Sequence, residues 1–233
     1  MSPDPALVQA LTEAVVPKGI AVVARDPRMM PPAHNPGEAD ALRGAVPSRL
    51  AEFHAGRAAA REAMIALGMP PHPLPMGPDR APVWPEWVTG SISHTASACV
   101  AAVGLRAQWA GIGVDLEEAT ALDPLLVAQI CTKSEQGWLG RQPAAERGLM
   151  AKLIFSAKEA SYKAQYPISR QLFGFDALEL SIDRETSRFA ARFLIEQGPF
   201  RVGSILAGRY VHAAGLLVTA VVVGQAEARQ LRG

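Results

Sequence analysis

Two short segments, far apart in the chain, combine residue types and spacings that could hold a metal ion and a phosphate ester. The first reads Gly-Ile-Gly-Val-Asp-Leu-Glu, and its alternation predicts a strand that carries Asp115 and Glu117 on one face. The second reads Phe-Ser-Ala-Lys-Glu-Ala-Ser-Tyr-Lys and predicts a helix in which Glu159 and Lys163 lie one turn apart. If the fold brings the segments together, these side chains and Lys158 suit a hard cation that carries a phosphate ester.

Each of these patterns also occurs at positions that neither bind a ligand nor take part in catalysis. Half-buried strands commonly carry polar residues on their outer face. Glutamate followed four residues later by lysine, as in Glu159 and Lys163, is a common exposed helix pair. Two adjacent carboxylates repel each other, however, so Asp115 and Glu117 favour a cation between them. Oxygen ligands of this kind suit magnesium, which keeps waters and substrate phosphates around it.

Three arginines lie on a helix that we expect to begin at an N-cap, Ser48, and to end before Gly68. The apolar residues of this helix form a seam, and Arg57 occupies one of its positions. Burying a charge without a partner is costly, so a carboxylate of the protein or a bound anion should meet Arg57. Arg61 follows one turn later, and Arg49 lies near the helix start.

A proline-rich loop and a serine–histidine segment could supply further phosphate contacts. Residues 70–85 predict an irregular loop, from which Arg80 could reach an anion. Ser93 and His94 precede a predicted buried strand, and both side chains can hydrogen-bond to phosphate oxygens. A hydrolase pair of these two residues is a poor interpretation, because neighbours in an extended segment point to opposite sides. A satisfied structural role is the usual alternative for a lone histidine.

Composition narrows the class of protein. The chain has 233 residues, of which 49% are hydrophobic, enough for one large domain or two small ones. Its net charge of +1 gives no support for nucleic-acid or anionic-membrane binding. Cys99 and Cys131 have no Cys-x-x-Cys spacing, which argues against a zinc site or a disulfide. No signal peptide and no apolar run of about 20 residues is apparent, so we expect a cytoplasmic monomer without a membrane span.

The predicted strands and helices alternate irregularly, which indicates an α+β fold. The predicted strands cover residues 20–24, 98–103, 112–116, 178–182, 190–195 and 216–223, and the predicted helices cover residues 48–67, 124–130, 133–139 and 149–165.

A faint internal repeat is present as well. The segment from Phe53 to Arg61 aligns with the segment from Phe155 to Lys163, and each is followed by a histidine and an apolar strand that ends in glycine. Chance similarity between alanine-rich helices is the alternative. A real repeat predicts a single-chain pseudo-dimer of two similar α/β halves, related by a pseudo-two-fold axis, with a ligand cleft between them. We expect these halves at 1–110 and 111–226, with a tail at 227–233.

Taken in chain order, the motifs resemble the 4′-phosphopantetheinyl transferases of the large, Sfp-type class, and within it the branch of enterobactin synthase component D. The matching pieces are Arg49 with Phe53-His-Ala-Gly-Arg57, Arg80-Ala-Pro-Val-Trp-Pro85, Ser91-Ile-Ser-His94, Gly113-Val-Asp-Leu-Glu117 and Phe155-Ser-Ala-Lys-Glu-Ala-Ser-Tyr-Lys163. The resemblance implies the pseudo-dimeric α+β fold and a reaction. A serine hydroxyl of an apo acyl or peptidyl carrier protein attacks the β-phosphate of coenzyme A, and 3′,5′-ADP leaves.

The resemblance also implies roles for individual residues. Asp115, Glu117 and Glu159 would hold Mg²⁺, or alternatively Mn²⁺, on the pyrophosphate of coenzyme A. Glu159 would accept the serine proton, directly or through a metal-bound water, and Lys163 would stabilise charge on the pyrophosphate. The other residues expected to bind coenzyme A are Arg49, Arg57, Arg80, Ser93, His94 and Lys158, and the helix pattern adds Arg61.

Three points stay open in the sequence. Relatives often carry a basic residue immediately before Arg80, where this chain has Asp79, so the phosphate contacts of this loop are uncertain. The predicted helices at 124–139 offer apolar residues for carrier docking, although ordinary core helices are the alternative. A non-catalytic coenzyme A or nucleotide-binding module and a metal-dependent phosphohydrolase are the alternative functions.

Overall fold

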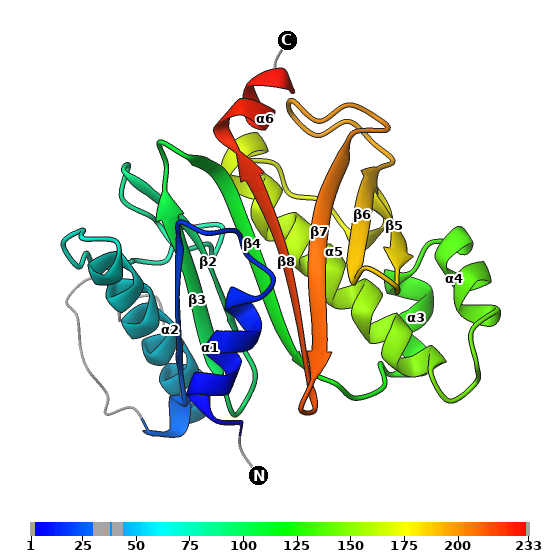
Figure 1. Cartoon of the computed structure of the whole chain (residues 1–233), viewed down its shortest axis with the longest axis horizontal. Helices are drawn as coiled ribbons and strands as arrows, with labels where there is room; N and C mark the ends of the chain where they lie inside the picture. The colour runs from blue at the N-terminus through cyan, green and yellow to red at the C-terminus, as the bar shows by residue number, and fades with distance from the viewer. Residues whose placement is uncertain (1–2, 30–37, 39–43, 232–233) are drawn as a thin grey trace.

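Two antiparallel sheets form the centre of the fold. The structure, a computed structural model, describes residues 3–29, 38 and 44–231. One sheet has the strand order β1-β3-β2, and the other has the order β4-β8-β7-β6-β5 (Figure 1). The strands are β1 (Ile20–Arg25), β2 (Val88–His94), β3 (Cys99–Leu105), β4 (Trp109–Glu118), β5 (Leu178–Asp183), β6 (Arg188–Phe193), β7 (Ile205–Ala213) and β8 (Leu216–Gly224).

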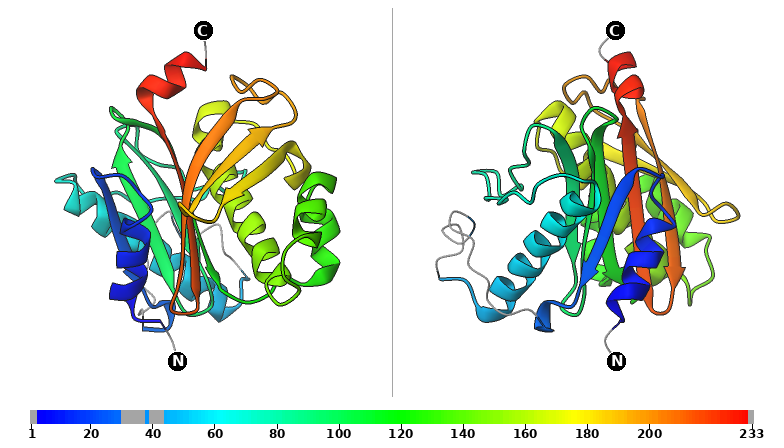
Figure 2. Two further views of the ribbon diagram at one scale, coloured as in Figure 1. Left: turned by 45° about the vertical axis from the view of Figure 1, so that its right-hand side comes forward. Right: turned by 60° about the vertical axis from the view of Figure 1, so that its left-hand side comes forward.

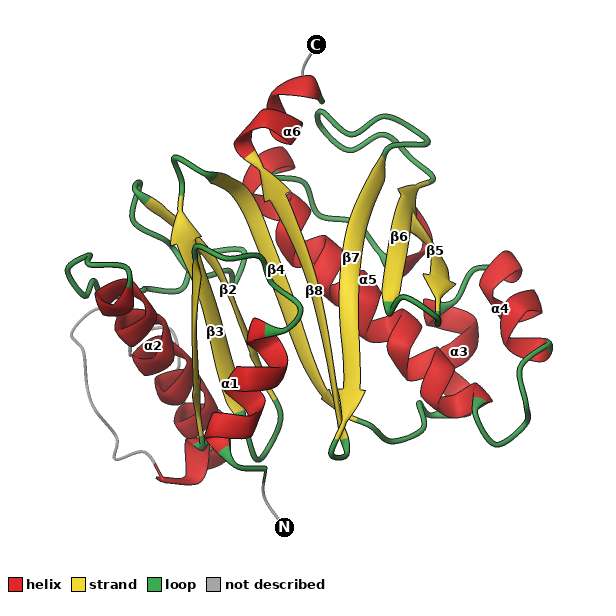
Figure 3. Ribbon diagram, in the orientation of Figure 1, coloured by secondary structure: helices red, strands yellow, loops and turns green. Residues whose placement is uncertain are grey.

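Helices cover both sheets, and the combination confirms the predicted α+β class. The helices are α1 (Pro5–Glu13), α2 (Pro47–Ala66), α3 (Pro124–Ile130), α4 (Lys133–Gly140), α5 (Arg147–Ser169) and α6 (Gln225–Gln230). The long helix α5 packs on β4 and β8, and α3 and α4 lie beside its N-terminal part (Figure 3). Among the residues that the structure describes, no helix is long and apolar enough to cross a membrane.

The middle strand of the smaller sheet, β3, is apolar on both faces because a helix covers each side. Ala101 and Val103 pack with the apolar residues of α2. Val100 and Ala102 point the other way and pack with residues of α1 and of the larger sheet. Figure 2 shows α1 and α2 on opposite sides of this sheet. Burial on both faces of β3 therefore explains the continuous apolar run at 98–103, which predicts a buried strand.

Helix α2 begins one residue before the predicted start. Its first residue is Pro47, and the N-cap is Val46, which makes no side-chain capping bond. The prediction that Ser48 caps the helix is therefore wrong, because proline favours the first helical position and shifts the boundary upstream. The predicted stop is confirmed, since Gly68 has a φ of 75°, a left-handed conformation that glycine adopts readily.

Helix α5 extends beyond its predicted end at residue 165. Pro167 lies within the helix, which continues to Ser169. Arg170 then takes a left-handed conformation, with a φ of 57°, and ends it. Proline commonly disrupts a helix interior, so the helix is predicted from the sequence to end before Pro167. The additional turn includes Tyr166, which lines the cavity of the candidate active site.

The sequence patterns do not predict α1, β2 or β7. Strand β2 reads Val-Thr-Gly-Ser-Ile-Ser-His, in which a glycine, two serines and a histidine interrupt the strand-favouring residues, and β3 and β4 flank it. Ser93 and His94 therefore lie inside a strand rather than ahead of one. Strand β7 carries exposed polar residues and joins β8 through a two-residue turn, in which Ala214 and Gly215 have φ angles of 51° and 75°.

The boundary between the two expected halves lies near the start of β4. That strand begins at Trp109, and the expected division is at residue 110. Helix α6 includes the start of the expected tail, and residues 232–233 of that tail lie outside the described residues. The division into two halves stays a prediction.

Candidate active site

A cavity of about 490 Å³ opens between α2, the loop that follows it, β2 and the C-terminal half of α5. This volume is within the range of small-molecule sites. Its lining is strongly basic and includes Arg49, Arg57, Arg80, His94, Arg106, Lys163 and Arg170. Asp79 is the one carboxylate among these described lining residues. The cavity is therefore suited to a ligand that carries several negative charges.

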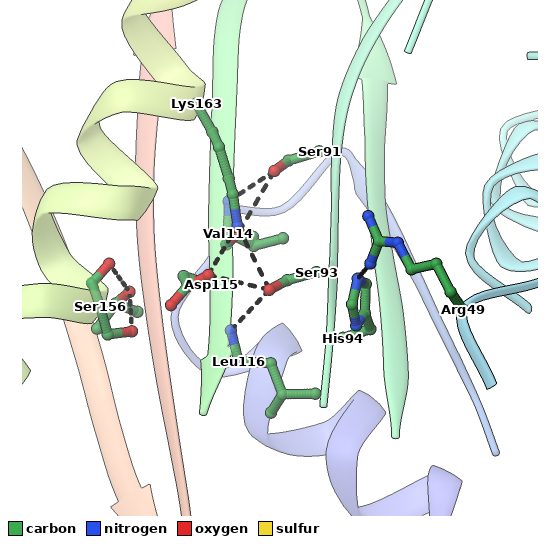
Figure 4. Close-up of polar contacts among 10 residues, drawn as sticks. Arg49, Ser91, Ser93, His94, Val114, Asp115, Leu116, Ser156 and Lys163 are labelled. Carbon is green, nitrogen blue, oxygen red and sulfur yellow. Dashed lines mark hydrogen bonds and ion pairs between the residues drawn. The ribbon is translucent and has the colours of Figure 1, made fainter. Parts of the chain in front are cut away.

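Arg49 and His94 form a pair at one wall of the cavity. Arg49 Nη1 lies 2.7 Å from His94 Nε2 (Figure 4), and Glu52 Oε2 lies 3.4 Å from His94 Nδ1. Arginine has only donors, so His94 Nε2 accepts and the ring proton lies on Nδ1, facing Glu52. Burial lowers the pKa of His94, Glu52 opposes this effect, and Arg49 and Lys163 add to it. His94 is thus neutral in this arrangement, and Arg49 retains further donors for an anion.

Arg57 is a buried arginine that forms no salt bridge with any described carboxylate, although the charge of Glu38 acts on it. Its residue is 7% exposed, its guanidinium lies 3.8 Å from the centre of the Phe53 ring, and its Nε donates to the carbonyl of Leu74 at 3.3 Å. Burial lowers its pKa to about 10. Within the described part of the chain, Arg57 forms no salt bridge. Of the two partners expected from the sequence, a bound anion in the cavity fits this geometry better than a protein carboxylate.

Lys163 connects the cavity to the predicted metal ligands. Its Nζ donates to Asp115 Oδ1 at 2.7 Å and to the carbonyl of Val114 at 3.2 Å (Figure 4). Asp115 is 4% exposed, and its Oδ1 also accepts from Ser93 Oγ at 3.0 Å. Its other oxygen, Oδ2, is buried and has no hydrogen-bond partner in the part of the chain that the structure describes. The structure therefore brings the two predicted segments together, as their residue types suggested.

Two serines of β2 join the two sheets at this point. Ser91 Oγ accepts from the N–H of Val114 at 3.0 Å, and Ser93 Oγ accepts from the N–H of Leu116 at 3.1 Å (Figure 4). These side chains take the place of backbone partners between the adjacent strands β2 and β4. Ser93 is buried and already bonded on both sides, and it does not line the cavity. The structure places it at this junction, and its expected contact with coenzyme A stays a prediction.

Glu117 and Glu159 belong to the same electrostatic neighbourhood as Asp115. Burial raises the pKa of Glu117, Asp115 adds to the effect, and Lys152, whose Nζ lies 3.0 Å from Glu117 Oε2, opposes it. Burial also raises the pKa of Glu159, Lys163 opposes this, and the charges of Asp115 and Glu117 raise it further. The three carboxylates therefore repel one another, a situation that a cation between them would relieve.

Comparison with known proteins decides the family. A family model described as the 4′-phosphopantetheinyl transferase N-terminal domain matches residues 37–104, and one described as the 4′-phosphopantetheinyl transferase superfamily matches residues 111–214. The 4′-phosphopantetheinyl transferase Svp of Streptomyces mobaraensis is 39% identical over 81% of this chain and 78% of its own length. The chain belongs to the 4′-phosphopantetheinyl transferase superfamily.

Further relatives agree with this assignment. The 4′-phosphopantetheinyl transferase PptT of Mycobacterium tuberculosis is 32% identical over 81% of this chain and 85% of its own length. Enterobactin synthase component D of Salmonella typhi is 34% identical over 61% of this chain and 58% of its own length. The resemblance stated from the motifs is confirmed. This phosphopantetheinyl transferase therefore uses coenzyme A as its substrate and modifies a carrier protein.

The residues around Asp115 fit a divalent cation in type. In the described ranges, no three His, Cys, Asp or Glu residues are already assembled as metal ligands. Oδ2 of Asp115 is nevertheless buried with no hydrogen-bond partner among the described residues, and burial, with the neighbouring carboxylates adding to it, raises the pKa of Glu117 and Glu159. Carboxylate oxygens are the donors that Mg²⁺ and Mn²⁺ prefer.

Two residues expected to bind coenzyme A lie elsewhere in the transferase. Arg61 Nη1 donates to the two oxygens of Glu38 at 2.6 and 2.8 Å, and Glu38 also accepts from the N–H of Leu74 at 2.8 Å. Arg61 does not line the cavity. Its guanidinium is held by a buried carboxylate, so the structure does not bring it to the ligand site.

Lys158 is the second such residue. It is 1% exposed, and its Nζ lies 2.8 Å from the carbonyl of Ile130, 2.9 Å from the carbonyl of Phe175 and 2.8 Å from Glu135 Oε2. These contacts use all three protons of the ammonium group. The side chain ties α3 and α4 to α5. Lys158 does not line the basic cavity, although it lines a smaller one together with Glu159 and Tyr162.

Four further charged or aromatic side chains line the cavity without having been predicted. They are Arg106, Tyr162, Tyr166 and Arg170. One of them could have been found, because Tyr166 follows Lys163 by three residues and so shares its helix face. The expected helix end at residue 165 hid this relationship.

Proposed function

We propose that the transfer takes place where the basic cavity meets the three carboxylates, with coenzyme A in the cavity and a divalent cation beside Asp115. The observation that carries this proposal is the position of Lys163, which lines the cavity and lies 2.7 Å from Asp115 Oδ1. One side chain thus contacts both the anion site and the carboxylate cluster. A pyrophosphate held there would lie between positive groups on one side and a metal on the other.

The cavity residues bind and orient the phosphates of coenzyme A. Arg49, Arg57, Arg80 and His94 line it, and by resemblance to the family they bind the 3′-phosphate and the diphosphate. The buried Arg57 contributes most, because a charge removed from water gains more from an anion than an exposed one does. Arg49 can turn from His94 Nε2 to a phosphate oxygen without a change in protonation.

Asp115, Glu117 and Glu159 would hold the divalent cation, Mg²⁺ or Mn²⁺. When bound, the ion supplies neutralisation of the pyrophosphate charge and a fixed orientation of the group. Asp115 would contribute to holding the ion, because its Oδ2 has no hydrogen-bond partner among the described residues while its Oδ1 accepts from Lys163.

Glu159 is the proposed base for the carrier serine. Without a bound cation, burial raises its pKa, Lys163 opposes this, and Asp115 and Glu117 raise it further. Its carboxylate lies in the same electrostatic neighbourhood as Lys163 and Asp115, from which it would accept the proton directly or through a water. The serine oxygen forms a bond to the β-phosphorus of coenzyme A, and its proton passes to Glu159. The bond from that phosphorus to the bridging oxygen breaks, and 3′,5′-ADP leaves with the electron pair. Lys163 stabilises the charge that develops.

The sheet topology supports the proposal that the chain is a pseudo-dimer. In the first half, β1 precedes a helix and the hairpin β2–β3, and the order in the sheet is β1-β3-β2. In the second half, β4 precedes α5 and the hairpin β7–β8, and the order is β4-β8-β7 before the added strands β6 and β5. The equivalent helices are α2 and α5, which carry Arg57 and Lys163. A cleft completed by both halves within one chain fits a monomer.

Helix α3 is the proposed docking surface for the carrier. Leu125 and Leu126 are 80% and 40% exposed, whereas Ile130 and Leu139 of the same predicted segment belong to the core. Lys133 is exposed at the start of α4 and would favour a carrier with acidic helices.

Two free cysteines agree with a reducing compartment, which supports the proposed cytoplasmic location.

Binding and transfer can be tested separately. Calorimetry should show that Arg57→Ala weakens coenzyme A binding, whereas Glu159→Gln should retain binding and lose transfer by about 10²–10⁴-fold, the usual contribution of a general base. A non-catalytic binding module would show no transfer in the wild-type protein. Full activity of Glu159→Gln would remove this residue from the mechanism.

A further inference from the structure

The loop that carries Arg80 is a tight turn with an unusual backbone. The N–H of Gly77 donates to the carbonyl of Ala81 at 2.8 Å, and the N–H of Arg80 donates to the carbonyl of Gly77 at 2.9 Å. Arg80 has a φ of 66°, a left-handed conformation that is uncommon for a residue with a Cβ atom. Such a conformation persists where its surroundings determine it. A contact that holds this turn therefore also sets the direction of the Arg80 side chain.

Asp79 supplies such a contact, and it does so from across the cavity. Its Oδ1 accepts from the N–H of Ala81 at 3.1 Å, and its Oδ2 accepts from the hydroxyl of Tyr166. Tyr166 lies on α5, three residues after Lys163. The lining of the basic cavity includes Asp79, Arg80, Ala81 and Tyr166. The hydrogen bond from Tyr166 thus joins the Arg80 turn to the helix that carries Lys163.

The charge of Asp79 is compensated in this arrangement. A free carboxylate in the wall of a phosphate site would repel its ligand. The hydrogen bond from Tyr166 is the main cause that lowers the pKa of Asp79, and Arg170 adds to it. The guanidinium of Arg170 lies 5.8 Å from the centre of the Tyr166 ring. Asp79 can therefore stay ionised beside the cavity with its negative charge directed at α5 rather than at the ligand.

We propose that Asp79 and Tyr166 form a clasp that fixes the Arg80 turn against α5 and so closes the cavity around coenzyme A. Asp79 is then a positioning residue that acts through Arg80. This inference rests on the proposed binding of coenzyme A in this cavity. The clasp spans the two halves of the chain, so it also sets the distance between Arg80 on the loop and Lys163 on α5.

Steady-state kinetics with saturating apo carrier protein and varied coenzyme A tests the clasp. Tyr166→Phe and Asp79→Ala should each raise KM for coenzyme A about two- to tenfold, the range of one hydrogen bond, with kcat within about twofold of wild type. The double variant should be no worse than the more affected single variant, because both changes break one contact. Asp79→Asn should lie close to wild type, since its amide can accept from Ala81 and donate to the oxygen of Tyr166.

A matched control separates the clasp from a general effect of losing a hydroxyl in the cavity. Tyr162 lies one turn earlier on the same helix and also lines the cavity, and its hydroxyl has no described bond to the loop. The effects of Tyr162→Phe and Asp79→Ala on KM should therefore be additive. An unchanged KM for Tyr166→Phe, or additive effects of Tyr166→Phe and Asp79→Ala, would overturn the clasp. If Arg57→Ala also left KM unchanged, the placement of coenzyme A itself would be wrong.

Discussion

A Cβ atom added to Gly113 would lie 1.9 Å from the carbonyl oxygen of Ala160. Gly111 stands in the same relation to Ala164, at 2.0 Å. No side chain fits in either place, so α5 can lie directly on β4 only because both strand positions are glycine. This close approach brings Lys163 within hydrogen-bonding distance of Asp115. The two glycines of the strand motif are therefore as important to the site as its carboxylates.

Gly113→Ala should push α5 away from β4. We expect a loss of stability of at least about 1–3 kcal/mol, the usual cost of overpacking, together with a large loss of transfer. Urea unfolding and a transfer assay at a temperature where the variant is folded would measure both. Gly137→Ala is the control, because the nearest atom to its added Cβ is a flexible Arg141 nitrogen at 3.8 Å and alanine favours a helix. Equal stability of Gly113→Ala and wild type would contradict the packing described here.

Arg57→Met should separate ligand binding from stability. Among the described residues the buried guanidinium forms no salt bridge, so an unbranched apolar side chain of similar length should leave the free energy of unfolding unchanged or raise it. KM for coenzyme A should rise about 10- to 100-fold, the range for a charged hydrogen bond. Thermal unfolding and steady-state kinetics measure the two effects. A strongly destabilised variant would mean that Arg57 has a structural role instead.

Lys158→Met should destabilise the fold without a direct effect on coenzyme A binding. It leaves Glu135, which is 2% exposed, as an uncompensated buried charge, at a cost of about 3–5 kcal/mol. Denaturant unfolding gives this cost, and calorimetry at low temperature gives the affinity for coenzyme A. The exposed Lys133→Met serves as the control and should change stability by less than about 0.5 kcal/mol. If Lys158→Met is folded and stable but binds coenzyme A more weakly than the wild type, Lys158 contributes to coenzyme A binding after all.

The raised pKa of Glu159 makes stability depend on pH when no divalent cation is bound. The folded protein holds this proton more tightly than the unfolded chain, whose glutamate has the ordinary value of 4.5. Stability attributable to Glu159 is therefore present below pH 4.5 and is lost as the pH rises through the raised value. With a chelator present, Glu159→Gln should be more stable than wild type at pH 7 and should match it at pH 4.

At pH 7, magnesium should make the wild type more stable than Glu159→Gln. At pH 7 it should raise the unfolding midpoint of the wild type and have less effect on Glu159→Gln, because a ligand that binds only the folded state stabilises it. Chemical unfolding at both pH values, with and without the ion, measures the whole pattern. A wild type that is more stable than Glu159→Gln in the chelated state at pH 7 would show that the three carboxylates do not repel one another as described.

The parts of the site that depend on local patterns could be predicted from the sequence. The strand with Asp115 and Glu117 alternates clearly, and Glu159 and Lys163 have helical spacing, so both elements and their functional faces follow from short-range geometry. The same is true of Arg57, because a charge on an apolar seam indicates burial. Their convergence was suggested by the family resemblance and is explained by the glycines of β4.

The parts that depend on distant partners could not be predicted. Arg61 and Lys158 differ from the ligand-site cations only in what they meet, namely the buried carboxylates of Glu38 and Glu135. Ser93 looks like a phosphate ligand in sequence, and only the adjacency of β2 and β4 shows its other role. Tyr166 was missed because Pro167 obscured the last turn of α5. In each case the deciding information lies in tertiary packing rather than in local propensity.

The intact mass of an apo carrier protein tests most directly whether the three carboxylates and the basic cavity form one transfer site. The carrier is incubated with coenzyme A, Mg²⁺ and either the wild type or one of three variants: Glu159→Ala, Arg57→Ala and Arg61→Lys, the last of which keeps a cation beside the buried Glu38. Wild type and Arg61→Lys should add the mass of one phosphopantetheine group, Arg57→Ala should do so only at raised coenzyme A, and Glu159→Ala or a chelator should abolish the adduct. Undiminished transfer by Glu159→Ala, or no adduct on any of several carriers with the wild type, would contradict this assignment.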